Sequence, residues 1–227
     1  MQFEVQISKL HVARCTSRRG FTIIELLVSI LLTSIIMGAI YSVYRVQTHS
    51  AKVQESRLEA QEYARSVLDM MVREIRNAGY FPTGTACSSP ANTSGIVAAD
   101  AQSLQFVYDF DANGDCLGPD ENITYAFSTA GCASGFVDIT RKEGANAAQP
   151  MTDCNVPTGT ANFSFTYYPQ DSTTAYATPV ASGSLGSIQR VLISLTVQSK
   201  KPDTEFGGQL NATMTSNADL RNRGLPS

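Results

Sequence analysis

The segment from residue 21 to residue 78 constrains the fold of this chain most, because almost nothing in it interrupts a helix. It contains no proline and one glycine, Gly38. Gly79 and Pro82 follow it, and this order is typical of a helix end. We therefore predict one helix over residues 21–78, about 87 Å long at the α-helical rise per residue.

The first part of this helix, residues 21–44, is apolar apart from one charge, Glu25. A stretch of about 20 apolar residues is long enough to cross a bilayer. Lysine and arginine precede the stretch, so the positive-inside rule places residues 1–20 in the cytoplasm and the C-terminal part in the periplasm. An ordinary signal anchor would share these features, and only a cleavage site separates the two interpretations.

The second part, from Gln47 to Ala78, mixes charged and apolar residues. The apolar residues recur at spacings of three, four and seven, which places them on one face of an amphipathic helix. They are Val53, Ala60, Ala64, Val67, Met71 and Ile75. Such a face needs a partner, and a β-sheet with one apolar side would cover it.

Residues 80–227, called the head below, show short alternating runs separated by Gly, Pro, Asn and Asp, a β pattern. The predicted strands are Leu104–Asp109, Asn122–Ser128, Phe136–Arg141, Asn162–Tyr168, Ser187–Ser199 and Gln209–Thr215. The fold class is therefore α+β, with the long helix packed on a mostly antiparallel sheet. Three parts are expected: residues 1–20, residues 21–79 and the head.

Charge is distributed unevenly along the chain. Residues 1–20 carry Lys9, Arg14, Arg18 and Arg19 against Glu4, a net +3, and this leaves −6 on the rest of a chain whose total is −3. No basic stripe remains after residue 20 to neutralise phosphates, so nucleic-acid binding is not expected.

Four of the five cysteines, Cys87, Cys116, Cys132 and Cys154, lie in the head. An even number in an exported, Gly/Ser-rich domain indicates two disulfides, and the spacing does not suit a zinc site. Pairing of nearest neighbours gives Cys87–Cys116 and Cys132–Cys154. Four cysteines allow three connectivities, and the sequence leaves the other two open.

One acidic loop has the opening of a calcium-binding loop, D-x-D-x-N-G-D. Its candidate ligands are Asp109, Asp111, Asn113, Asp115 and, at position twelve, Asp120 where a glutamate is usual. The alternative is a hairpin turn, since turns between strands are commonly acidic. No other cofactor is expected.

The main motif lies at the junction between residues 1–20, called the leader below, and the helix. Arg18-Arg19-Gly20-Phe21 leads into the apolar run with Glu25 as its carboxylate, and this resembles the type IV prepilin signature. The resemblance implies that a membrane peptidase cuts between Gly20 and Phe21 and N-methylates the new amine. It also implies that Glu25 meets the amine of a neighbouring subunit during assembly. A carboxylate inside a membrane helix costs at least about 2.5 kcal/mol, so a function is expected for Glu25. The alternative is that Glu25 is uncharged or lies at the level of the lipid headgroups, a few residues from the interface.

The resemblance extends to PilW-type minor pilins through residues 57–65 and 71–81, and more loosely through residues 190–195 and 220–224. Ser42 stands where many major pilins carry a helix-bending proline, which favours the minor class. The implied partners are other major and minor pilins, the prepilin peptidase and the inner-membrane assembly platform. The implied location is the bacterial inner membrane, crossed once with the head in the periplasm, and then the pilus at the cell surface.

Three functions follow from these features. The first is a minor pilin that primes assembly or forms the pilus tip. The second is the J-type minor pseudopilin of a type II secretion system, and the third is a tip adhesin or binding module. An enzyme is not expected, because the two histidines, His11 and His49, lie outside the head and no catalytic motif is present.

Overall fold

A computed structural model describes residues 20–82, 87–88, 91–92, 94–118, 120–199 and 210–221. The expected leader lies outside the described residues except for Gly20, and so do residues 222–224 of the PilW-like tail. The chain divides into two compact units, Met1–Ser50 and Ala51–Ser227. Each unit is described by itself below.

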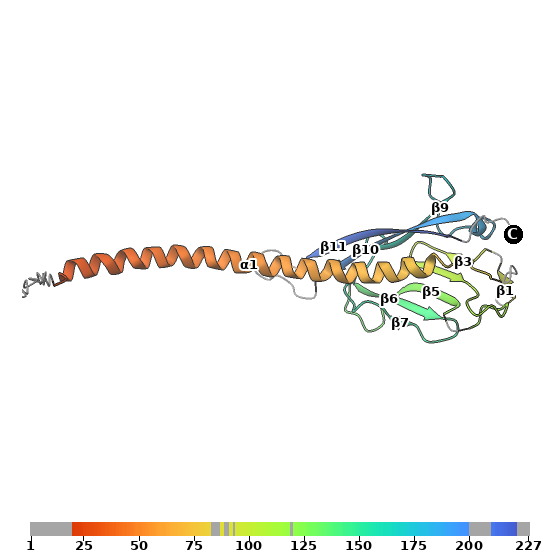
Figure 1. The fold of residues 1–227 in the computed structure, drawn as a ribbon, viewed down its shortest axis with the longest axis horizontal. Helices are drawn as coiled ribbons and strands as arrows, with labels where there is room; N and C mark the ends of the chain where they lie inside the picture. The colour runs from red at the N-terminus through yellow and green to blue at the C-terminus, as the bar shows by residue number, and fades with distance from the viewer. Residues whose placement is uncertain are drawn as a thin grey trace, which may run out of the picture. The chain divides into compact units, whose positions relative to one another are not determined.

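Helix α1 runs from Ile23 to Ile75 (Figure 1). Thr22 precedes its first turn, and the Thr22 hydroxyl accepts the backbone N–H of Glu25 at 3.3 Å, an N-cap interaction. Gly38 remains helical. A turn follows Ile75 and ends at Gly79, whose φ of 75° is the left-handed conformation typical of a helix terminus. The predicted helix is confirmed, and its ends lie within one turn of those expected.

The second unit contains all the strands, and every pairing described is antiparallel. One sheet has the order β3-β4-β5-β6-β7 with β8 on β6, a second has the order β11-β10-β9, and β1 pairs with β2. The bounds are β1 Cys87–Ser88, β2 Ala91–Asn92, β3 Ile96–Ala99, β4 Ser103–Val107, β5 Asn122–Ser128, β6 Phe136–Glu143, β7 Gln149–Pro150, β8 Val156–Pro157, β9 Phe163–Pro169, β10 Ile188–Gln198 and β11 Asn211–Asp219. A 3₁₀ helix, η1, spans Ser182–Ser187.

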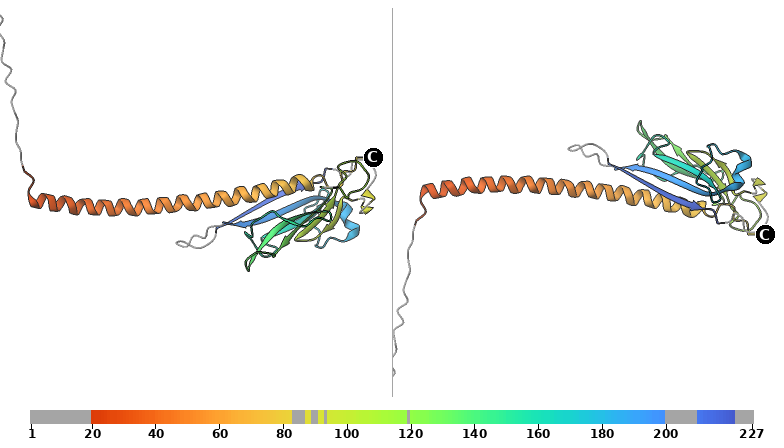
Figure 2. Two further views of the ribbon diagram at one scale, coloured as in Figure 1. Left: turned by 90° about the horizontal axis from the view of Figure 1, so that it is seen from below. Right: turned by 90° about the horizontal axis from the view of Figure 1, so that it is seen from above.

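The two larger sheets lie along one side of the C-terminal part of α1 (Figure 2). They approach each other where the N–H of Phe165 in β9 donates to the carbonyl of Ala101, before β4, at 2.8 Å. The α+β class is confirmed, and each of the six predicted strands corresponds to an observed one. The division of the strands into two main sheets was not foreseen.

The core of the second unit lies between α1 and these sheets. The buried residues of α1 are Ala60, Ala64, Val67, Leu68, Met71, Val72 and Ile75. All of these except Ala60 belong to one cluster with the inward faces of both sheets, including Val191, Ile193, Leu195 and Val197 of β10, which are fully buried. The predicted apolar face is therefore the core face, except that Val53 lies at its margin and is only half-buried.

The end of α1 is joined to β3 and β4 at a crossing of two glycines. The N–H of Gly79 donates to the carbonyl of Val107 at 2.9 Å, and the N–H of Val107 donates to the carbonyl of Gly95 at 2.8 Å. Gly95 has a φ of 72°. A Cβ on Gly95 would lie 2.9 Å from the carbonyl carbon of Ala78, and closer still to the backbone of Gly79. The two backbones therefore meet without room for a side chain.

Candidate processing and assembly site

The expected cleavage site lies just before α1, in the first unit. Gly20 and Phe21 are outside the helix and exposed, and Phe21 exposes 81% of its surface. A Cβ on Gly20 would meet no atom within 4 Å. The bond between them is therefore accessible, and the chain itself does not require glycine at position 20.

The residues after this bond form a continuous apolar surface. Every large apolar side chain from Phe21 to Val46 is exposed within this unit. By length and composition, α1 is the one helix in the described part of the chain that could cross a membrane. Exposed apolar surface of this extent marks a site for lipid or for other protein helices.

Glu25 lies in the first turn of α1 and is exposed. The hydroxyl groups that follow it donate to backbone carbonyls of the preceding turn, so they need no outside partner. These groups are Ser29, Thr33, Ser34 and Ser42, with donor–acceptor distances of 2.7–2.8 Å. The Glu25 carboxylate is thus the one charged side chain on the apolar part of α1, residues 23–44.

Two protein families match this chain. Residues 52–216 match the family described as prepilin peptidase-dependent protein B, over more than half of the sequence. The chain belongs to this family. Residues 15–41 match the prokaryotic N-terminal methylation motif, and this match includes Gly20, Phe21 and Glu25. No curated protein and no solved structure matches the chain.

These matches confirm the family resemblance: this member of the prepilin peptidase-dependent protein B family is a type IV pilin-like minor pilin. The two matches cover different parts of the chain. The methylation motif covers the apolar start of α1, and the family match covers the amphipathic part of α1 and most of the head. The family indicates a pilin-like structural protein.

A largely buried arginine, Arg141, attaches the C-terminal end of α1 to the sheet. The Arg141 guanidinium from β6 contacts Glu74 of α1 at 3.0 Å, Asp120 at 2.6 Å and also Glu143. Its side chain is 11% exposed, and that of Glu74 is 17% exposed. The Tyr125 hydroxyl donates to Glu74 at 2.5 Å. The contact between Arg141 and Glu74 was not predicted from the sequence, because the two residues lie 67 positions apart.

Two tyrosines border this arginine and remain protonated well above neutral pH. Burial and then the charge of Glu74 raise the pKa of Tyr108 to about 12. The same two causes, in the same order, raise the pKa of Tyr125 further. Burial by itself would lower the pKa of Arg141, but hydrogen bonds to its three carboxylates raise it overall. The arginine therefore remains charged at every pH at which the fold exists.

Replacing Arg141 with methionine should lower the free energy of unfolding by about 3–5 kcal/mol, because it leaves Glu74 nearly buried without a cation. Replacing Arg73, an exposed residue of α1, with methionine should change it by less than about 0.5 kcal/mol. Urea denaturation of the detergent-solubilised chain, followed by circular dichroism, measures both. Equal stability of the two variants would show that the Arg141 contacts contribute nothing.

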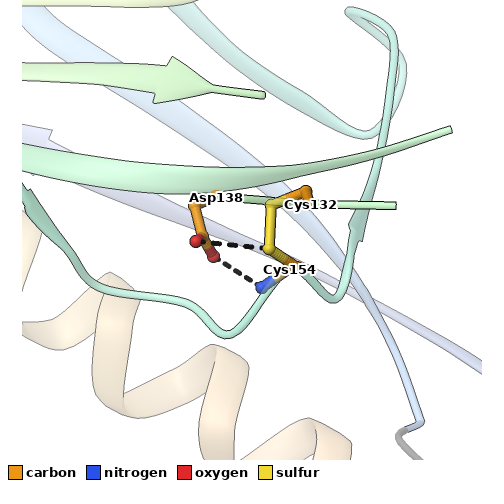
Figure 3. Close-up of side chains that lie close together, drawn as sticks. All are labelled: Cys132, Asp138 and Cys154. Carbon is orange, nitrogen blue, oxygen red and sulfur yellow. Dashed lines mark hydrogen bonds between the residues drawn. A yellow bond between two sulfur atoms is a disulfide. The ribbon is translucent and has the colours of Figure 1, made fainter. Parts of the chain in front are cut away.

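The four cysteines of the head form two disulfides, Cys87–Cys116 and Cys132–Cys154, which are the expected pairs. Beside the second, Asp138 accepts the N–H of Cys154 at 2.6 Å (Figure 3). Asp138 also accepts the hydroxyl of Thr152 at 3.0 Å. The Sγ of Cys154 lies 3.5 Å from the same carboxylate. Because a disulfide sulfur has neither a proton nor a free thiolate, this group is a structural contact and not a metal site.

The acidic loop brings only part of the expected ligand set together. Carboxylate oxygens of Asp109, Asp111 and Glu121 lie within 4.8 Å of one another. Asp115 does not belong to this group, and the side chains of Asn113 and Asp115 accept the N–H groups of Asp115 and Leu117 respectively. Asp120 turns away to Arg141.

Glu121 was not in the expected ligand set because spacing from Asp109 favoured position twelve. The alternation of the following strand was the usable signal: Ile123 and Tyr125 of β5 are buried, and Glu121 is on the same face. Extending the period of two by one step would have placed Glu121 inside and Asp120 outside.

Proposed function

We propose that this chain is cleaved between Gly20 and Phe21, methylated on the new amine, and incorporated into a type IV pilus as a minor pilin. One observation carries this proposal: an accessible Gly20–Phe21 bond stands directly before the apolar part of α1, residues 23–44, whose single charge is Glu25. Family membership supports it.

Each of these features suits one step of the proposed pathway of cleavage, retention in the membrane and assembly. A peptidase at the membrane surface can accommodate an extended backbone most easily at glycine, which has no side chain. Cleavage before the apolar run leaves the helix in the bilayer. Hydrolysis of the bond consumes one water molecule, creates a charged amine on Phe21 and leaves Gly20 at the end of the leader as a carboxylate. The new amine can then pair with Glu25 of a neighbouring subunit, which removes an isolated charge from an apolar environment.

The amphipathic part of α1 carries the head out of that apolar environment. Its buried face is already covered by the sheets of the second unit, so the head is a folded body that a filament can display at its surface. In the proposed location, the chain crosses the inner membrane once with the head in the periplasm, and assembly then moves it to the cell surface. The proposed partners are other pilins, the prepilin peptidase and the assembly platform. A role in priming assembly or at the tip fits a minor subunit.

The Gly20→Val variant tests the proposal. A β-branched side chain restricts the extended backbone in the peptidase, whereas nothing in this chain crowds position 20. We expect the variant to keep its leader, to run at the size of the full chain and to be missing from sheared pili. Gly20→Ala is the matched control and should be cut at least partly, because alanine remains small.

Immunoblots of membrane and sheared-pilus fractions measure both steps. A Gly20→Val protein of mature size would show that the cleavage site is elsewhere. Wild-type protein that is cut but absent from pili, together with a secretion defect in a deletion strain, would favour the J-type pseudopilin.

A further inference from the structure

The acidic loop between β4 and β5 is a feature that the proposed assembly function does not use. We propose that this loop binds one calcium ion through Asp109, Asp111 and Glu121. The ligand set is not the one expected from the spacing of the sequence motif, and two independent observations support it.

The first observation is the grouping of the three carboxylates. Their ligand oxygens all lie within 4.8 Å of one another. Oxygens bound to calcium lie about 2.4 Å from the ion, so two ligands of one ion can be at most about 4.8 Å apart. The three side chains are therefore already close enough to share an ion.

The second observation is a buried oxygen without a partner. Asp109 is completely buried. Its Oδ2 accepts the N–H of Gly114 at 3.1 Å, but its Oδ1 has no hydrogen-bond partner among the described residues. A buried carboxylate oxygen that loses water without gaining a donor is costly, and native proteins rarely leave one in that state. A cation held between Asp109, Asp111 and Glu121 would satisfy it.

The charges of the loop also favour a cation. Glu121 is 1% exposed and accepts the N–H groups of Phe110, Asp111 and Gly118 at 2.7–3.2 Å. Three carboxylates lie together, and in the described part of the chain no lysine or arginine forms an ion pair with any of them. Like charges at this distance repel strongly when two of them are buried, and a divalent cation would reverse the sign of that interaction.

The loop is held in shape without the ion. Asp111 accepts the backbone and side-chain N–H groups of Asn113, both at 3.1 Å. Cys116, within the loop, is bonded to Cys87. A site whose ligands are already positioned loses less entropy when an ion binds.

The chemistry of the ligands selects the class of ion. All three side chains offer carboxylate oxygen, which suits a hard cation and not zinc or copper. Asp111 is exposed, so one side of the site is open to water, which can complete a coordination number of six to eight. We expect a dissociation constant of about 0.1–1 mM, the range of extracellular calcium modules.

Two single-charge variants of the same loop test the ligand set. Asp111→Asn removes a proposed ligand, and Asp120→Asn removes an equal charge from an exposed neighbour that contacts Arg141 instead. Calcium chloride is titrated calorimetrically into the EDTA-treated full-length chain in detergent. We expect Asp111→Asn to weaken binding about tenfold or more, and Asp120→Asn to change it by less than about twofold.

A thermal shift provides the second readout. Calcium in excess should raise the melting temperature of the wild type and of Asp120→Asn, and EDTA should abolish the rise. Magnesium at the same concentration should raise it less, because that ion needs shorter, octahedral bonds. The proposal is overturned if the wild type shows neither heat nor a thermal shift at about 10 mM calcium, tenfold above the expected range. It is also overturned if Asp120→Asn loses binding as Asp111→Asn does.

Discussion

The Glu25→Leu variant should still be cleaved and inserted into the membrane, yet it should be missing from filaments. Leucine favours both a helix and a bilayer, so neither the start of α1 nor its insertion is harmed. The proposed partner, the amine on Phe21 of a neighbouring subunit, would then lie in an apolar environment without a counter-charge. Removing one member of a buried pair costs about 3–5 kcal/mol, which corresponds to a decrease in incorporation of at least a hundredfold.

Two further variants make this result specific. Thr33→Leu makes a similar change from polar to apolar on the same helix, but the Thr33 hydroxyl only donates to Ser29 of its own helix. The Thr33→Leu variant should therefore enter filaments like the wild type. Glu25→Gln keeps the size and hydrogen-bonding capacity of the side chain and removes its charge.

Quantitative immunoblots of sheared filaments, normalised to the cleaved protein in membranes, measure the effect. If Glu25→Gln assembles like the wild type, the charge is not needed. If Glu25→Leu also does, Glu25 acts at the level of the lipid headgroups or not at all, and the proposed pairing is wrong.

The sequence predicts the elements of this fold well where the pattern is local. The helix was foreseen because 58 residues lack proline and contain a single glycine. Strand β10 was foreseen because Val191, Ile193, Leu195 and Val197 recur at every second position. Strand β11 was predicted at Gln209–Thr215 but runs from Asn211 to Asp219, so both predicted ends lie too early in the sequence. It is one of the two edge strands of its sheet, and its Asn, Thr, Ser and Ala residues alternate little in hydrophobicity. Its length follows from pairing with β10, up to Arg190 opposite Asp219.

Other parts of the fold depend on the tertiary structure. Strands β1, β2, β7 and β8 have two residues each, too few to show a period. Leu68 and Val72 were missing from the predicted core face, which was drawn as one narrow stripe. Because two sheets and not one cover α1, the buried arc is wider than a single stripe.

The residues of the candidate sites also divide into those that a local sequence pattern predicts and those that only the tertiary structure brings together. Gly20, Phe21 and Glu25 lie within six consecutive positions, so their order alone identified them. The contact between Arg141 and Glu74 could not be foreseen, because no local pattern joins residues on α1 and β6. Among the possible loop ligands, Asp120 and Glu121 are adjacent in sequence, and only the pleat of the following strand determines which of them faces inward.

Replacing Gly95 with alanine should have the largest effect on stability, a loss of about 4 kcal/mol or more in the free energy of unfolding. A side chain at a φ of 72° is strained by about 1–3 kcal/mol. The added methyl group would also meet the backbone of Ala78 and Gly79, which cannot change rotamer to avoid it. Urea denaturation of the solubilised chain, or its resistance to a protease in membranes, measures the loss.

Two glycine controls separate strain from crowding. Gly131 has a φ of 81°, and a Cβ there would meet no atom within 4 Å, so Gly131→Ala should cost only the backbone strain. Gly79 is the other half of the crossing, but a Cβ there would lie 3.6 Å from Gly95, an ordinary contact distance. We therefore expect Gly79→Ala to resemble Gly131→Ala and not Gly95→Ala.

This asymmetry follows from how the two backbones cross. A Cβ on Gly95 would point at the backbone of Ala78 and Gly79, in the turn that follows α1, whereas a Cβ on Gly79 would lie no closer than 3.6 Å to Ser94 and Gly95. Both glycines are joined to Val107, so a displaced Gly95 would pull β3 and the end of α1 away from β4 together. If all three alanine variants lost equal stability, the close approach at Gly95 would not limit the fold, and the attachment of α1 to the sheets would rest on its apolar face and on the contact between Glu74 and Arg141.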